Sequence, residues 1–357
     1  MRFAIGATAA VLAILSGGGG QATCQIASDP WHVAATSRAL SEEIQFTNGD
    51  AHLRGTVYFP KSGNHLAAVV VLHHAGLPTR DANLYRHLCE GLPAIGIAVL
   101  VYDRRGSGQS SGDLGKADYE TLADDAVAGQ HALAKLPQID PNEIGFWGLS
   151  QGGWLAVLAA GRSKDAAFAI SVSAPLVTAD EQMQFATRNL LTVRGYSSLD
   201  VQDMLVARRA WIRYLHRKGS RDEAVEALRK VEAKPWFDIA YLPKASQLTN
   251  DPEHDPNRKR LDDDPMAAVQ QANVPLLFLY ADSDPWVPVA ESVKRLQSLA
   301  TKIPTIQYAV VGNANHEMMF PEHETMQVDQ ETTRKEAPQA PSYFMLVAAW
   351  ITRHVGH

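Results

Sequence analysis

Continuous apolar segments that alternate with helical ones restrict the possible folds of this chain more than any other feature. Ala67 to Leu72 and Ile97 to Tyr102 are apolar throughout, and helical periodicity follows each of them. The same alternation returns late in the chain, with strands expected at 275–280 and 305–311. Strands that are apolar on both sides belong in a parallel sheet with helices on both faces. The sequence therefore predicts an α/β fold with a mostly parallel central sheet.

The alternation is interrupted once, by a long segment that is rich in charged residues. Residues 178–265 contain only helical stretches, which are expected at 178–195, 199–218 and 221–233. Because no strand pattern falls inside this segment, we interpret it as an insertion. We predict one α/β domain made of residues 40–177 and 266–357, with 178–265 as an inserted helical cap.

Composition and charge limit the classes of molecule that we expect the protein to bind. The 357 residues are 46% hydrophobic and 20% charged, with a formal net charge of −6, which is ordinary for a globular protein. The basic triplet Arg258–Arg260 is followed closely by three aspartates and is interpreted as a solvated loop. No long basic run is present, so we expect no nucleic-acid partner. The sequence sets no expectation for the oligomeric state.

The first 23 residues differ from the rest of the chain. Arg2 precedes an apolar stretch from Phe3 to Leu15, which Ser16 and four glycines follow. This order is typical of a secretory signal peptide, with cleavage after Ala22 or close to Cys24. The apolar stretch is too short to span a bilayer as a helix. We therefore expect a secreted or periplasmic protein with no stable membrane insertion after cleavage, and an uncleaved anchor is the alternative.

A G-x-S-x-G motif at Gly148–Gly152 directly follows another apolar, strand-like run. Small residues flank Ser150 because a sharp strand-to-helix turn leaves no room for larger ones. Such a turn presents the hydroxyl of the serine to a substrate. A serine hydroxyl is a weak nucleophile, so it also needs a base, an acid that orients the base, and donors for an oxyanion.

The loops after two later strands supply the acid and the base. Asp284 lies a few residues beyond the strand at 275–280, and we favour it over Asp282, which suits a bond to the turn backbone. His316 follows the strand at 305–311. The order serine, aspartate, histidine along the chain is the one expected for a nucleophile elbow in a sheet of this kind.

Two backbone amides are candidates for the oxyanion hole. Gln151 begins the helix after the serine, and Ala75 lies in the loop after the strand at 67–72, with Gly76 as the alternative donor. The adjacent His73 and His74 suggest a metal, but no third ligand is spaced to join them, so we expect neither a metal nor another cofactor.

A glycine-rich segment, a cysteine and several aromatic or sulfur-containing residues also need an interpretation. The glycine-rich segment Asp103–Gly108 lacks the ending of a phosphate-binding loop and is interpreted as a structural turn beside the site. Cys89 is expected to be a buried structural thiol. The aromatic and sulfur-containing residues near the motif and in the insertion either fill the core or line a substrate pocket: Trp147, Trp154, Trp286, Met183, Phe185, Trp211 and Tyr214.

Taken together, these motifs resemble the bacterial α/β-hydrolase superfamily, and most of all its serine esterases of the dienelactone-hydrolase and prolyl-oligopeptidase-like kind. The resemblance spans residues 40–357 and rests on Leu72–Gly76, Asp103–Gly108, Gly148–Gly152, Asp284 and His316. Members of this family usually carry His-Gly where this chain has His73 and His74. They commonly hold a cap at the point where residue 178 begins the insertion.

The resemblance implies acyl transfer to water. It implies a carboxylesterase that cleaves a small-molecule ester, with Ser150 as nucleophile, His316 as base and Asp284 as the acid that orients the base. A peptidase or amidase with the same residues is the nearest alternative, and a thioesterase comes third. A hydrolase-like fold that only binds a ligand is a different class, which an intact triad disfavours.

Overall fold

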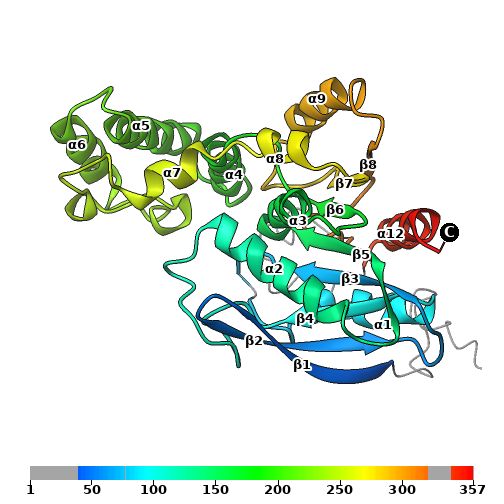
Figure 1. The fold of residues 1–357 in the computed structure, drawn as a ribbon. Coiled ribbons are helices and arrows are strands. Elements are labelled where there is room, and N and C mark those ends of the chain that lie inside the picture. The colour runs from blue at the N-terminus through cyan, green and yellow to red at the C-terminus, as the bar shows by residue number, and fades with distance from the viewer. Residues whose placement is uncertain (1–38, 77, 321–338, 357) are drawn as a thin grey trace, which may run out of the picture. The chain divides into compact units, whose positions relative to one another are not determined.

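The computed structural model describes residues 39–76, 78–320 and 339–356, so the predicted signal segment at 1–23 lies outside the described residues. Within the described residues, eight strands form a single sheet (Figure 1). The strands are β1 (Leu40–Asn48), β2 (Ala51–Phe59), β3 (Leu66–Leu72), β4 (Ala98–Tyr102), β5 (Ile139–Leu149), β6 (Ala169–Val172), β7 (Leu276–Ala281) and β8 (Ile306–Val311).

The sheet is antiparallel at one edge and parallel elsewhere. Its spatial order is β1-β2-β4-β3-β5-β6-β7-β8. β1 and β2 form a hairpin whose turn contains Gly49 at a φ of 60°, and β2 also pairs antiparallel with β4. Every pair from β4 to β8 is parallel. The prediction of a mostly parallel α/β sheet is confirmed.

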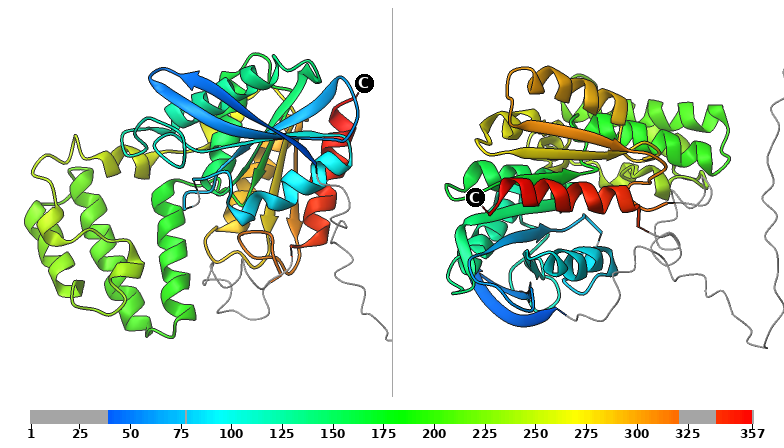
Figure 2. Two further views of the ribbon diagram at one scale, coloured as in Figure 1. Left: turned by 90° about the horizontal axis from the view of Figure 1, so that it is seen from below. Right: turned by 90° about the vertical axis from the view of Figure 1, so that its right-hand side faces the viewer.

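Helices cover both faces of the sheet because its strands are apolar on both faces. In β3, Ala68 and Val70 contribute to one core cluster, whereas Val69 and Val71 contribute to the other. The first cluster packs against α2 (Tyr119–Leu133), α3 (Gln151–Arg162) and α9 (Val289–Ala300). The second packs against α1 (Arg86–Ala94) and α12 (Pro341–His354), which lie on the same side of the sheet in Figure 2. A short helix, η1 (Asn83–Tyr85), precedes α1.

The chain between β6 and β7 is helical. Its elements are α4 (Ala179–Val193), α5 (Ser198–Leu215), α6 (Arg221–Val231), η2 (Asp238–Ala240), η3 (Ala245–Gln247), α7 (Pro256–Asp262) and α8 (Met266–Gln271). Capping boxes at Thr178, Ser197 and Ser220 begin α4, α5 and α6, which fixes where these helices start. A separate apolar cluster that includes Met204 and Trp236 holds the segment together. We call residues 178–265 the cap segment.

The prediction of a solvated loop at Arg258–Arg260 is wrong, because the structure places these residues in α7. The side chain of Asp255 accepts a hydrogen bond from the backbone N–H of Asn257, and Pro256 occupies the first turn. An aspartate cap followed by proline favours a helix start, and this signal outweighs the charge pattern. Among the helices in the described part of the chain, none has the length and apolar character to cross a membrane.

Candidate active site

Ser150 lies at the turn between β5 and α3, with φ 56° and ψ −119°. This positive φ is unfavourable for a residue with a side chain and persists only where the surroundings enforce it. A Cβ on Gly148 would collide with the carbonyl of Gly152, and a Cβ on Gly152 would collide with the carbonyl of Leu72. The two glycines are therefore required by the close approach of the backbone, and the turn holds the serine at the carboxyl edge of the sheet.

Asp284 and His316 meet although they follow different strands. His316 Nδ1 donates to Asp284 Oδ2 over 2.8 Å, while Asp284 Oδ1 accepts from the N–H groups of Trp286 and Val287 at 2.8 and 3.1 Å. Both side chains are buried. With Nδ1 carrying the proton, Nε2 of the neutral imidazole is left as the base. The competing Asp282 is exposed and instead accepts from the hydroxyl of Ser283.

Asn315 braces the loop that carries the histidine. Its buried side-chain oxygen accepts from the backbone N–H groups of Glu317 and Met319 at 3.0 and 2.9 Å. These bonds close the loop around His316. Asn315 was not among the residues predicted from the sequence, although asparagine commonly accepts the backbone N–H two residues later in a turn of this kind.

The loop after β3 contains three consecutive backbone amides, two of which donate to side chains. His74 N–H donates to Tyr85 Oη at 3.0 Å, and Gly76 N–H donates to His74 Nδ1 at 2.8 Å. Ala75 N–H has no hydrogen-bond acceptor among the described residues. Gln151 is the first residue of α3, so its N–H has no acceptor within the helix. The geometry thus favours Ala75 over Gly76 as partner of Gln151 in an oxyanion hole.

The glycine-rich segment Asp103–Gly108 forms a hydrogen-bonded turn beside the site. Asp103 accepts from the N–H groups of Arg80 and Gln109 at 3.0 and 2.9 Å, and a Cβ on Gly108 would collide with its carboxylate. The buried Arg104 donates to Gln151 Oε1 at 2.8 Å and to the carbonyl of His73 at 2.7 Å. Arg104 therefore joins the two loops that carry the oxyanion-hole candidates, a role that its sequence motif did not reveal.

The two adjacent histidines have different surroundings. The ring of His73 packs edge-on against Tyr85 and Tyr102, with centroids 5.1 and 5.3 Å away. Burial, followed by the nearby positive charge of Arg104, holds the pKa of His73 well below its ordinary value, so the ring stays neutral. His74 instead lines the pocket at Ser150, and its ring centroid lies 6.4 Å from that of His316.

A pocket of about 490 Å³ opens at the serine. Its wall includes the candidate residues Ser150, His316, Ala75 and Gln151, and a group of large side chains, namely Tyr119, Trp154, Met183, Tyr241 and Trp286. Of the residues whose use was left open, Trp154, Trp286 and Met183 line the pocket. Trp147 is buried in the core of the sheet, and Trp211 and Tyr214 pack inside the cap segment.

The cap segment is bonded to the loop that carries the acid. Gln182 Nε2 donates to the carbonyl of Trp286 at 3.0 Å, and Asn189 Nδ2 donates to the carbonyl of Pro285 at 3.1 Å. Both donors lie on α4, so this helix contacts the pocket and also restrains the residues next to Asp284.

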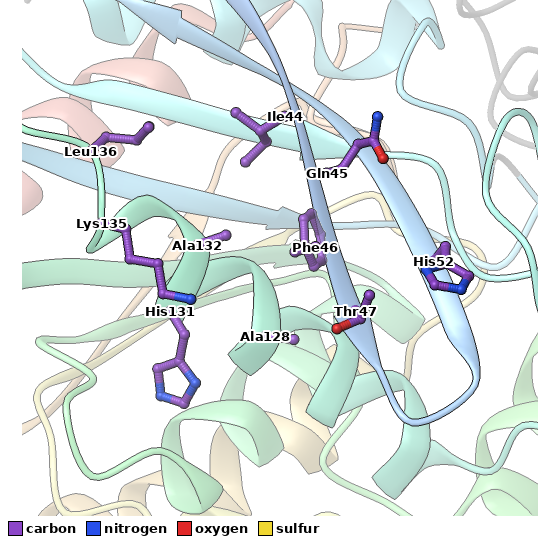
Figure 3. Close-up of a pocket in the computed structure, with 10 residues that line it drawn as sticks. All are labelled: Ile44, Gln45, Phe46, Thr47, His52, Ala128, His131, Ala132, Lys135 and Leu136. Atoms are coloured by element: carbon purple, nitrogen blue, oxygen red, sulfur yellow. The ribbon is translucent and has the colours of Figure 1, made fainter.

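Two further pockets lie elsewhere on the described chain. One of about 560 Å³ adjoins the site, because Ala75, Tyr119 and Gln151 line it together with Arg104 and the cap residue Asp263. Another of about 620 Å³ lies between β1 and α2 (Figure 3). None of the candidate catalytic residues lines this last pocket.

Comparisons with known proteins agree with this fold. The chain is 31% identical to a polyketide transferase of Penicillium crustosum over 144 residues, which are 40% of this chain and 46% of that protein. It is 33% identical to a thiohydrolase of Arthrinium phaeospermum over 127 residues, 34% of this chain and 39% of that protein. The matched stretches therefore span less than half the length of these curated relatives.

Solved structures are similar over a larger part of the chain. An esterase of Pyrococcus furiosus matches 89% of this chain and 92% of its own, with a TM-score of 0.54 and 17% identity. An acylaminoacyl peptidase of Pyrococcus horikoshii matches 90% of this chain and 42% of its own, with a TM-score of 0.53 and 15% identity. At these identities the likeness shows the fold, and it confirms the predicted α/β-hydrolase architecture.

A family profile described as serine aminopeptidase S33 matches residues 63–324. The matched range contains the elbow at Ser150, the whole cap segment, and both Asp284 and His316. Because the match covers more than half of the chain, the protein belongs to this family of α/β hydrolases.

Proposed function

We propose that the protein is a serine hydrolase that cleaves small-molecule carboxylic esters through an acyl-enzyme. His316 Nε2 takes the proton of Ser150 as its oxygen attacks the ester carbonyl, and the N–H groups of Ala75 and Gln151 hold the oxyanion. The imidazolium then protonates the leaving alcohol. In deacylation, the same nitrogen activates a water molecule, which attacks the acyl-enzyme and releases the carboxylic acid product.

One observation carries the proposal. The buried hydrogen bond between His316 and Asp284 fixes the proton on Nδ1 of the imidazole and leaves Nε2 as the base. Ser150, at its strained turn, and His316 line the same pocket. A nucleophile, a base and an acid that fixes the tautomer of the base are the parts that acyl transfer requires.

The pocket wall supports a substrate with a bulky apolar or aromatic group. Aromatic rings of Tyr119, Trp154, Tyr241 and Trp286 line a volume of about 490 Å³, which suits a small to medium-sized ligand. Flat apolar groups gain both burial and edge-to-face ring contacts in such surroundings. The finer likeness to dienelactone hydrolases stays a prediction from the motifs.

A fluorophosphonate probe tests the reaction class. We expect the probe to label the protein on Ser150, and Ser150→Ala to lose both the label and hydrolysis of p-nitrophenyl acetate. Failure to label the parent protein would refute the serine-hydrolase proposal. Labelling that persists in Ser150→Ala would mean that another serine is the nucleophile.

Thioester or amide cleavage is the second candidate. The family description names an aminopeptidase, and a curated relative is named a thiohydrolase. The same residues serve all three reactions, so the leaving group has to be tested directly. We expect p-nitrophenyl esters to react faster than matched acyl thioesters and aminoacyl p-nitroanilides. Faster turnover of the anilides or thioesters at equal concentration would reassign the substrate class.

We propose further that residues 1–23 direct export and that the mature protein is secreted or periplasmic. The support is the charged start and the short apolar stretch of the sequence. Expression in a bacterial host followed by N-terminal sequencing of the exported fraction tests this. A cytoplasmic protein that begins at Met1 would contradict it.

A further inference from the structure

His74 makes contacts that the proposed catalytic steps do not use. Its Nδ1 accepts the backbone N–H of Gly76 at 2.8 Å, and its own backbone N–H donates to Tyr85 Oη at 3.0 Å. A Cβ on Gly76 would lie 3.1 Å from Cε1 of the His74 ring, which leaves little room for a side chain there. The ring is thus packed over its own loop and links residue 74 to residue 76.

A buried carboxylate lies on the other side of this ring. Glu317 Oε1 is 4.0 Å from His74 Nε2, and the two side chains are 1% and 9% exposed. Because Nδ1 accepts a hydrogen bond, a neutral His74 carries its proton on Nε2, the nitrogen that faces the carboxylate. A negative charge at this distance favours that tautomer.

Glu317 and His74 form an acid–imidazole pair like that of Asp284 and His316, but the nitrogen that carries the proton is Nε2 instead of Nδ1. Asp284 keeps the proton of His316 on Nδ1, which leaves Nε2 as the base. Glu317 favours the proton of His74 on Nε2, which leaves Nδ1 as an acceptor. One acid–imidazole pair supplies a base, and the other supplies a fixed acceptor for a backbone amide.

We propose that His74 is a positioning residue for the oxyanion hole. Its Nδ1 holds the amide of Gly76, so the loop leaves the amide of Ala75 to the oxyanion, and Glu317 fixes the tautomer that makes this possible. This inference rests on the proposed acyl-transfer function. It gives His74 a role in stabilising the transition state without contact to the reacting atoms.

Substitutions at position 74 separate this role from simple packing. Asparagine has an oxygen that accepts the N–H two residues later, as in an Asx turn, whereas alanine has none. For p-nitrophenyl acetate we expect His74→Ala to lower kcat about 10- to 100-fold with KM within about twofold, since loss of one oxyanion donor costs about 100- to 1000-fold. His74→Asn should recover most of the loss. His131→Ala, an exposed histidine on α2, is the matched control and should be unchanged.

The inhibition constant of a transition-state analogue distinguishes the proposed role from simple packing, because a packing role would not change it selectively. A trifluoromethyl ketone adds to the serine and forms an oxyanion, whereas the matched methyl ketone only occupies the pocket. We expect His74→Ala to raise the inhibition constant of the trifluoromethyl ketone by the same factor as kcat/KM falls, and to leave that of the methyl ketone unchanged. Glu317→Gln should show the same pattern with a smaller change.

Two results would overturn the proposal: a kcat in His74→Ala equal to that of the parent, or His74→Asn as slow as His74→Ala. If the melting curve of His74→Ala shows that this variant does not fold, the role of His74 is tested by comparing His74→Asn and Glu317→Gln with the parent. The parent is first labelled with the fluorophosphonate probe. Absence of that label refutes the proposed function itself, whereas a labelled parent with an unaffected His74→Ala refutes only the role of His74.

Discussion

At the scale of single residues, the candidate site depends on which nitrogen of each imidazole carries a proton. Asp284 has both carboxylate oxygens engaged, one by His316 and one by the amides of Trp286 and Val287. An asparagine has nearly the same shape and keeps an oxygen for the amides. It cannot hold the histidine in the productive tautomer, because its nitrogen donates instead of accepting.

We therefore expect Asp284→Asn to lower kcat about 10⁴-fold while the protein stays folded. The matched control is Asp282→Asn, which changes an exposed aspartate two residues earlier on the same loop. It should retain kcat within about twofold, since surface substitutions of this kind have small effects. Steady-state kinetics and melting curves of both variants provide the check, and similar losses in the two would argue against Asp284 as the acid.

The candidate catalytic residues could be predicted from the sequence, but most of the residues that hold them in place could not. Ser150, Asp284 and His316 each follow a recognisable apolar strand, so their place at the carboxyl edge follows from chain order and strand pattern. Asn315 bonds amides of its own loop, whereas Arg104 and His74 contact residues that are distant in sequence. Such contacts depend on the finished packing, which no local pattern encodes.

At the scale of elements, the cap segment brings one exposed aromatic residue to the pocket. Tyr241 follows η2 with a φ of 52°, and its ring centroid lies 6.3 Å from that of Trp286. The carbonyl of the preceding Ala240 accepts from the buried Arg208 at 2.8 Å. This bond anchors the turn from inside the cap segment, so the position of the ring is set by the helices behind it.

We expect Tyr241→Ala to lower kcat/KM for p-nitrophenyl phenylacetate up to about tenfold, because an aromatic pair contributes about 0.5–1.5 kcal/mol. Hydrolysis of p-nitrophenyl acetate, whose acyl group is much smaller and carries no ring, should change less than twofold. Tyr241→Phe keeps the ring and is the control. A uniform loss on both esters would show that the residue supports the fold rather than selects the substrate.

The positions of helices and strands could be predicted well where the local sequence contains a clear signal, such as an apolar run or a capping residue. Strands β3, β4, β6 and β7 are largely apolar runs, and Thr178, Ser197 and Ser220 begin helices close to the expected starts. The order of the strands in the sheet has no such local mark, because pairing is decided by tertiary packing. The helix α7 has a local signal in the cap at Asp255, which outweighs the charge pattern at Arg258–Arg260.

At the scale of the whole molecule, acid should destabilise the fold through a histidine between two helices. His87 on α1 is bonded at Nδ1 to the carbonyl of Leu84 and at Nε2 to Tyr343 Oη on α12, over 3.0 and 3.2 Å. Burial lowers its pKa from 6.5 to about 4. The folded state therefore favours the neutral ring, and the stability that this gives is present above pH 6.5 and is lost as the pH falls toward 4.

We expect the free energy of unfolding to fall between pH 7 and pH 4.5 by about 2 kcal/mol more in the parent than in His87→Gln, since each unit of pKa shift is worth about 1.4 kcal/mol. Urea titrations at several pH values measure this difference. The substitution keeps a polar side chain and removes the titration. Parallel pH profiles for the two proteins would exclude His87 as a source of acid sensitivity.

The position of the cap segment along the chain has a consequence for synthesis. Ser150 precedes residues 178–265, whereas Asp284 and His316 follow them. Because a chain is made from its N-terminus and its domains fold as units, a nascent chain that ends before β7 holds the proposed nucleophile without its proposed acid and base. Under the proposed mechanism, Ser150 is made early and would become reactive only after the last strands have joined the sheet, so an unfinished chain on the ribosome would not hydrolyse an ester.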